Sequence, residues 1–168
     1  MKKQKGFSLI ELLIVVAIIL IIAAIAIPNL MRSRMAANEA SAVGSLRTIN
    51  TSEVTYSTSY GIGFAPLLNL GGPIGAVCVA SSNTACLLDG LLSAGTKSGY
   101  NIATPVPPGL GAIAAPNVTY VSNAAPTVPG QSGVRTFCSD MSGVIRNDPT
   151  GAVVAGALAA CQALNAIQ

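Results

Sequence analysis

Cysteines are the most reactive side chains in this sequence, and their number and spacing predict cross-links. They lie at positions 78, 86, 138 and 161, and the chain contains no histidine. A zinc site is disfavoured, because the sequence has neither a Cys-x-x-Cys pair nor an imidazole ligand. An even cysteine count behind an export-type N-terminus is typical of two disulfides. Three pairings are open, and we predict Cys78–Cys86 with Cys138–Cys161, which closes the shortest loops.

Recognisable catalytic machinery is missing from the sequence. Without histidine, no Ser-His or Cys-His nucleophile pair can form, and there is no glycine motif for a nucleotide phosphate. Asp140 and Asp148 flank a predicted hairpin, but two carboxylates are too few for the roughly six to eight oxygen ligands of calcium. We therefore expect no enzymatic activity, no metal, no cofactor and no small-molecule substrate.

Positive charge is concentrated at the N-terminus. The formal net charge is +3, and Lys2, Lys3 and Lys5 all lie within the first six residues. The other six basic residues balance the six acidic ones. Charged residues make up only 9% of the chain, against about 25% in an average soluble protein. The sequence after these first six residues therefore shows no basic stripe for nucleic acid.

One acidic residue, Glu11, lies beside a long apolar run. Uncharged apolar residues extend from Leu12 to Ile27, and residues 7–27 would span ~31 Å as a helix, enough to cross a membrane. The lysines predict a cytoplasmic N-terminus. A secretory signal peptide cut near Ala26, or a plain anchor, would not need a carboxylate that costs up to about 3 kcal/mol in this setting. Glu11 therefore calls for a cationic partner.

Residues 5–13, Lys-Gly-Phe-Ser-Leu-Ile-Glu-Leu-Leu, resemble the class III signal of type IV pilins and type II secretion pseudopilins. The resemblance implies that a prepilin peptidase cuts between Gly6 and Phe7, and that Phe7 is then N-methylated. It also implies that Glu11 pairs with the amine of a neighbouring subunit during assembly. Many type IV pilins have proline at the position of Pro28, where we expect a helix kink. Many also have glycine where this chain has Leu20, which departs from the pattern.

Helical signals continue past the proline. Apolar residues recur every three or four positions as one face of a helix, at Ala36, Ala40, Val43, Leu46 and Ile49. We predict a single helix over residues 7–60. Residues 1–6 would be the cleaved leader, 7–28 the transmembrane and filament-core part, and 29–60 the amphipathic continuation.

Glycine and proline become frequent after residue 60. Residues 61–99 are expected to form a connecting loop with a short helix capped near Asn83 and Thr84. Residues 100–168 would form an antiparallel β head with a C-terminal disulfide loop. The four strand-like runs cover 100–104, 118–122, 134–139 and 144–147. The expected fold class is α+β and type IV pilin-like, with a long N-terminal helix on a small sheet of three to four strands.

The resemblance implies a structural subunit of a type IV pilus, polymerised into a helical filament for adhesion, motility or DNA uptake. Its partners would be further copies of the chain, a prepilin peptidase, an inner-membrane assembly platform and, before assembly, inner-membrane lipid. The precursor would lie in a bacterial inner membrane and the mature form in an extracellular or periplasmic filament. The alternatives are a pseudopilin of a type II secretion system and a monomeric membrane-anchored binding module.

Overall fold

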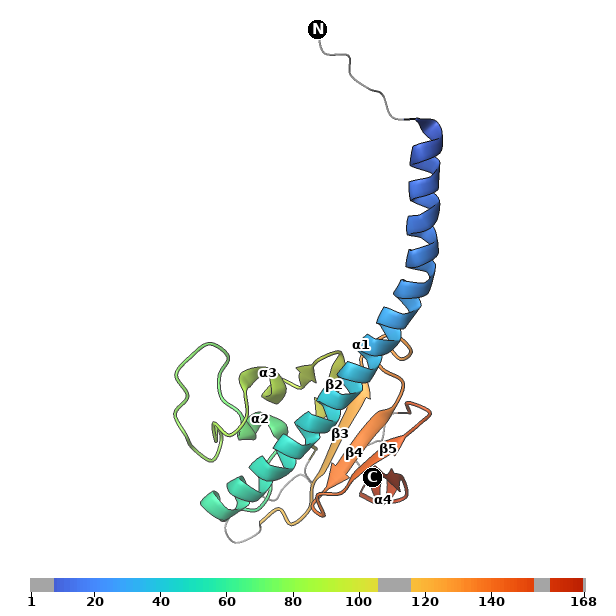
Figure 1. Cartoon of the computed structure of the whole chain (residues 1–168). Coiled ribbons are helices and arrows are strands. Elements are labelled where there is room, and N and C mark those ends of the chain that lie inside the picture. The colour runs from blue at the N-terminus through green and yellow to red at the C-terminus, as the bar shows by residue number, and fades with distance from the viewer. Residues whose placement is uncertain (1–7, 106–115, 153–157, 168) are drawn as a thin grey trace. The chain divides into compact units, whose positions relative to one another are not determined.

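The computed structural model describes residues 8–105, 116–152 and 158–167. It contains two compact units, one ending at Arg34 and the other beginning at Met35. The described helices are α1 (Leu9–Tyr60), α2 (Leu67–Leu70), α3 (Gly90–Ser93) and α4 (Leu158–Gln162) (Figure 1). The described strands are β1 (Thr96–Lys97), β2 (Tyr100–Ala103), β3 (Val121–Pro126), β4 (Thr136–Asp140), β5 (Ile145–Asp148) and β6 (Asn165–Ala166).

The first unit consists, in its described part, of the apolar beginning of α1. By length and composition this helix could cross a membrane, since an 18-residue window has a mean hydropathy of 3.3 and none of it is buried. Pro28 lies inside α1 and does not end it. A proline removes one backbone hydrogen bond, and the neighbouring apolar residues are good enough helix formers to carry the helix through.

In the second unit, α1 buries one face against the head. The buried positions recur every three or four residues, as one side of a helix requires: Glu39, Ala42, Ser45, Leu46, Ile49, Ser52, Glu53 and Tyr56. The predicted face is correct at Leu46 and Ile49 but wrong at Ala36 and Ala40, which are exposed. Polar residues occupy much of the buried face, and a pattern of apolar residues cannot identify them.

The head contains one antiparallel sheet in the order β1-β2-β3-β4-β5-β6. The predicted class, a long helix on an antiparallel sheet, is confirmed, whereas the predicted number of three to four strands is wrong. The edge strands β1 and β6 have two residues each, which is too short for the alternating pattern that identifies a strand. Strand β3 was expected at 118–122 but lies at Val121–Pro126. Its Ser, Asn and Ala residues have weak strand preference, so the sequence does not indicate where this strand begins and ends.

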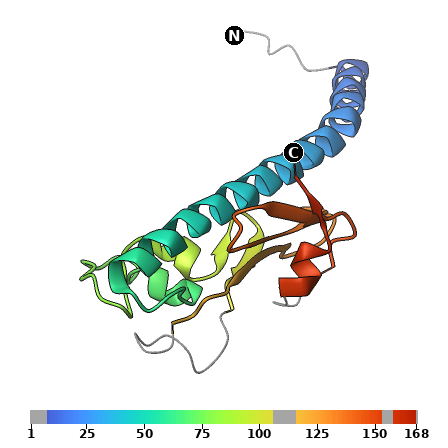
Figure 2. The ribbon, with the colours of Figure 1, turned by 90° about the horizontal axis from the view of Figure 1, so that it is seen from below.

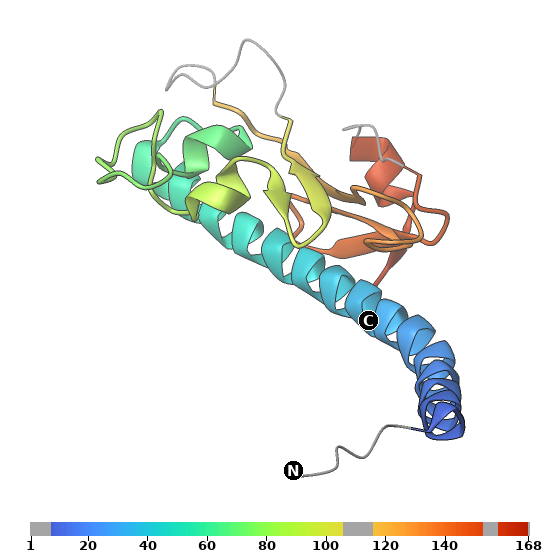
Figure 3. The same cartoon turned by 90° about the horizontal axis from the view of Figure 1, so that it is seen from above.

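The sheet is covered on both faces. Within the head, the second half of α1 lies on one side of the sheet and α4 on the other (Figures 2 and 3). All five residues of β4 are consequently buried. Phe137 faces the core beneath α1, whereas Cys138 belongs to a smaller cluster with Val121 and Cys161 on the α4 side.

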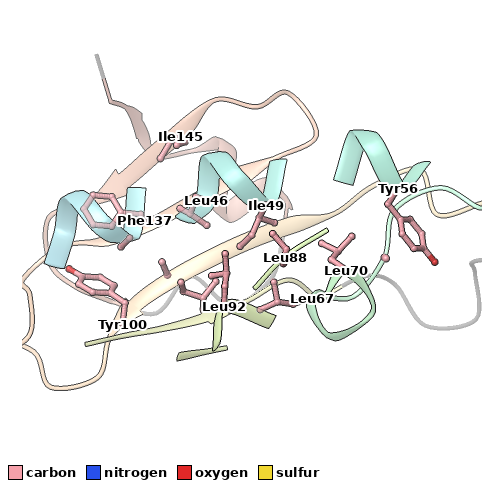
Figure 4. Packing of buried hydrophobic residues seen from close by; sticks show 14 of the residues in the cluster. Leu46, Ile49, Tyr56, Leu67, Leu70, Leu88, Leu92, Tyr100, Phe137 and Ile145 are labelled. Carbon is pink, nitrogen blue, oxygen red and sulfur yellow. The ribbon is translucent and has the colours of Figure 1, made fainter. Parts of the chain in front are cut away.

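The main core joins α1, α2, α3 and the sheet (Figure 4). Its largest fully buried side chains include Leu46 and Ile49 of α1, Tyr100 of β2 and Phe137 of β4. Burying each aliphatic or phenyl side chain of this size stabilises the head by about 1.5–3 kcal/mol. This core holds the second half of α1 in place.

Disulfides and caps organise the connections. Cys78 is bonded to Cys86, and Cys138 to Cys161. The expected cap near Asn83 and Thr84 is wrong: α3 begins after Asp89, whose carboxylate accepts a hydrogen bond from the Leu92 amide at 2.8 Å. Asn83 and Thr84 instead belong to a tight turn in which Ser81 pairs with Thr84. A helix cannot begin at Cys86, because this residue has a positive φ of 59° that helical backbone excludes.

Candidate assembly site

Glu11 lies in the first turn of α1, on the surface of the unassembled chain. Its Oε2 accepts a hydrogen bond from the backbone amide of Ser8 at 2.9 Å. This is one half of a capping box, in which a glutamate at the third helical position binds the amide of the residue that precedes the helix. A carboxylate here also lies favourably in the field of the helix dipole.

Ser8 was not among the residues singled out from the sequence, although Ser-x-x-Glu before an apolar run is a readable signature of this cap. Gly6 and Phe7, where processing is expected, lie outside the described residues. The structure therefore places Glu11 and Pro28 on α1 and leaves the Gly6–Phe7 bond undescribed.

A long apolar surface lies around and after Glu11 on α1. From Leu9 to Met31, the large apolar side chains of α1 are each about half exposed or more, and Leu9 reaches 80%. Contiguous apolar surface of this extent is unusual on a monomer in water and marks contact with lipid or with another protein. The part of α1 that carries Glu11 is therefore built to be covered by something outside the chain.

Comparison with known proteins identifies that context. Residues 1–27 match the family model of the prokaryotic N-terminal methylation motif. Over 99 residues the chain is 37% identical to the type IV wide pilus major component PilA4 of Thermus thermophilus, an overlap that covers 54% of this chain and 76% of the relative. The chain belongs to the type IV pilin family.

A second relative of this pilin is the type IV major pilin protein PilA of Myxococcus xanthus. The two are 39% identical over 72 residues, which cover 38% of this chain and 33% of the relative. No solved structure gave a significant match. Both relatives are structural pilus components, and the resemblance to pilins seen in the leader is confirmed.

A partly buried ion pair attaches the pilin helix to the head, with Glu39 buried and Arg135 open to solvent. Glu39 Oε2 lies 2.8 Å from Arg135 Nη2 and 2.9 Å from Arg135 Nε, and Glu39 Oε1 accepts from the amides of Val134 and Arg135. Burial alone would raise the pKa of Glu39, but these amides and the guanidinium outweigh it and lower the pKa. The Arg135 guanidinium also lies 5.3 Å from the centre of the Phe137 ring, an additional favourable contact.

A second acid is buried near the end of α1. Glu53 is completely buried, its Oε2 accepts from the Ala65 amide at 2.9 Å, and its Oε1 has no hydrogen-bond partner in the described part of the chain. Burial raises its pKa to about 8, although the Ala65 amide acts in the opposite direction. No cation among the described residues acts on this pKa, so the Glu53 carboxyl is protonated at neutral pH. Its hydrogen bond to the Ala65 amide fixes the start of the connecting loop.

The two aspartates near the last hairpin are not brought together as a metal site. Asp140 is buried and accepts from Gln162 Nε2 at 3.0 Å, from Ser142 and from Arg146 at 3.4 Å. Asp148 instead accepts from the amide and hydroxyl of Thr150. In the described parts of the chain, no group of three or more His, Cys, Asp or Glu residues could hold a metal ion.

Proposed function

We propose that this chain is a pilin precursor that is trimmed between Gly6 and Phe7 by a prepilin peptidase, N-methylated on Phe7, and polymerised through α1 into a helical filament. The observation that carries the proposal is the exposed apolar surface of α1 with Glu11 at its start, and residues 1–27, which include the first part of this helix, match the methylation motif. The proposal divides the chain into a leader (1–6), a membrane and filament-core helix (7–28), its amphipathic continuation (29–60), a connecting loop (61–99) and a β head (100–168).

Glu11 gives the assembly its electrostatic register. The α-amino group that cleavage creates on Phe7 titrates near 7.7–8 and is therefore mostly cationic at neutral pH. The Ser8 amide engages only Oε2 of Glu11, so Oε1 is available to the amine of a neighbouring subunit without loss of the helix cap. In an apolar filament core an unpaired carboxylate is costly, whereas a paired one is tolerated.

The same apolar helix serves two environments in turn. Before assembly it would lie in the lipid of the inner membrane, and an assembly platform there would move subunits into the filament. After assembly the apolar surfaces of neighbouring copies would cover each other. The mature filament would then be extracellular and serve adhesion, motility or DNA uptake.

A type II secretion pseudopilin would use the same leader and the same Glu11. The pilus is the better supported of the two, because both relatives reported above are named as major pilus components. A monomeric membrane-anchored binding module would leave Glu11 without a partner.

Electron microscopy of fibres sheared from cells, with mass spectrometry of their subunit, tests the proposal. We expect long fibres whose subunit lacks residues 1–6 and begins with methylated Phe7. A fibre subunit that retains Lys2, Lys3 and Lys5, or a mature protein cut after Ala26 so that Glu11 is lost, would overturn the proposal. Trimmed subunits without external fibres would instead support the pseudopilin alternative.

A further inference from the structure

Half of the basic residues beyond the leader lack an anionic partner among the described residues. The ion pairs found there are Lys97–Asp89, Arg135–Glu39 and Arg146–Asp140. Arg32, Arg34 and Arg47 remain, and all three are exposed on α1. These exposed guanidinium groups are available to bind an anion that is not part of the folded chain.

Two of these arginines directly follow the apolar surface of α1. Met31 is the last large apolar residue of this surface, and Arg32 and Arg34 come next. Arg32 lies 21 positions after Glu11, which corresponds to ~31 Å of helix and matches the roughly 30 Å thickness of a hydrocarbon core. Residues two positions apart point to opposite sides of a helix, so the pair can reach anions on both sides.

We propose that Arg32 and Arg34 bind the phosphates of anionic phospholipids at the outer surface of the inner membrane and fix the depth of the apolar helix. Glu11 and the Gly6–Phe7 bond would then lie at the inner surface, where the peptidase can reach the bond. This inference rests on the proposed function, because it requires a membrane-inserted precursor. Guanidinium groups bind phosphate through two parallel hydrogen bonds.

The other source of anions would be the carboxylates of a second copy, and the structure leaves few of these. Three of the six acidic residues of the chain are already paired with cations, as given above, and Glu53 is buried. Glu11 is assigned to the amine of a neighbour. Only Asp148 remains, half-buried and already accepting two hydrogen bonds from Thr150. Lipid phosphate is therefore the favoured partner.

A single tryptophan can report the depth of the helix. The chain contains no tryptophan, so Met31→Trp in the full-length precursor gives a unique emission next to the arginines. The protein is placed in vesicles of phosphatidylethanolamine and phosphatidylglycerol, with bromine atoms either near the headgroups or deep in the acyl chains. With both arginines present, we expect the shallow bromines to quench the emission more strongly than the deep ones.

Replacing both arginines, as Arg32→Gln with Arg34→Gln, should allow the outer end of the helix to sink. Each basic residue favours a helix position with that residue at the anionic membrane surface by about fivefold over a deeper one. Loss of both arginines therefore weakens the preference for the shallow position by about 30-fold. We expect the ratio of deep to shallow quenching to rise at least about twofold. Arg47→Gln, the matched control, removes another exposed arginine without an ion-pair partner among the described residues, 15 positions after Arg32, and should leave the ratio unchanged.

Four results would overturn the inference. An unchanged ratio in the double variant would show that the arginines do not set the depth, and an equal shift in Arg47→Gln would show that charge anywhere on α1 is enough. The same shift in Asp148→Asn would identify a second copy, not lipid, as the partner. Water-like emission from every variant would instead overturn the membrane insertion on which the proposed function also depends.

Discussion

Glu39 and Arg135 are separated by 96 positions in the sequence, yet their side chains form two charge-assisted hydrogen bonds of 2.8 and 2.9 Å. Glu39 lies on the buried face of α1, and Arg135 immediately precedes β4. The carboxylate also satisfies two backbone amides of the chain that leads into β4. This ion pair is what joins the helix electrostatically to the centre of the sheet.

We predict that Glu39→Gln lowers the free energy of unfolding of the head by about 1–3 kcal/mol, less than for a fully buried pair because solvent reaches Arg135. Urea unfolding of the full chain in detergent, followed by the near-ultraviolet circular dichroism of the buried tyrosines, measures the change. Arg47→Gln is the control and should change the stability by no more than about 0.5 kcal/mol. Equal stability of Glu39→Gln and the unmodified chain would contradict the assigned role.

The lowered pKa of Glu39 also predicts how this stabilisation depends on pH. The folded chain holds the proton less tightly than the unfolded chain, whose glutamate titrates near 4.5. The contribution of Glu39 is therefore present above pH 4.5 and is lost as the pH falls below that value. Unfolding curves at several acidic pH values should show the difference between the unmodified chain and Glu39→Gln shrinking as the pH falls.

Glu53 predicts the opposite dependence at neutral and alkaline pH. Its folded carboxyl keeps the proton up to about pH 8, whereas the ordinary value is 4.5. Its stabilising contribution is therefore complete below pH 4.5 and is lost as the pH rises towards 8. Burial first, and the charge of Glu53 in addition, raise the pKa values of Tyr56 and Tyr120, and neither tyrosine adds a positive charge to offset the ionised form of Glu53.

Glu53→Gln, which cannot ionise, should flatten the decline in stability between pH 5 and 8. The variant should exceed the unmodified chain by a few kcal/mol at pH 8, within the range expected for a buried carboxyl. The measurement is a series of urea unfolding curves across this pH range. Glu39→Gln should retain the decline, and a decline of the same size in Glu53→Gln would show that another group causes it.

The two disulfides should differ in their resistance to reduction. Cys138 and Cys161 are completely buried between the sheet and α4, whereas Cys78 and Cys86 are partly exposed. Thiol–disulfide exchange requires access of the attacking thiolate to a sulfur atom. We predict that a mild reductant opens Cys78–Cys86 first, which alkylation of the released thiols followed by peptide mass spectrometry would show. Release of Cys138 and Cys161 at the same rate would mean that the C-terminal segment opens readily.

Residue patterns predicted the long helix and the class of the head well, since 52 residues of α1 carry strong helical and apolar signals. They failed where neighbours far away in the sequence decide the structure. The local pattern does not indicate that Glu39 and Glu53 are buried, because Arg135 and Ala65, which make their burial tolerable, lie elsewhere in the chain. The position of strand β3 was predicted wrongly for a similar reason. Its pairing with β2 and β4, and not its own residues, sets its position.

The assembly site shows the same division. Glu11 could be found from the sequence, because a carboxylate beside a long apolar run is costly in local terms. Its hydrogen bond to the Ser8 amide adds the helix cap. In the proposed filament, the partner of the other carboxylate oxygen would come from another copy of the chain, and no pattern within one sequence contains that partner.

The most direct test of the account compares filament yield from cells that express the unmodified precursor, Glu11→Ala or Arg47→Gln at equal amounts in the membrane. We predict that Glu11→Ala inserts into the membrane normally and yields few or no filaments, whereas Arg47→Gln assembles like the unmodified chain. Filaments of Glu11→Ala in normal number would contradict the pairing of this carboxylate with a neighbouring amine.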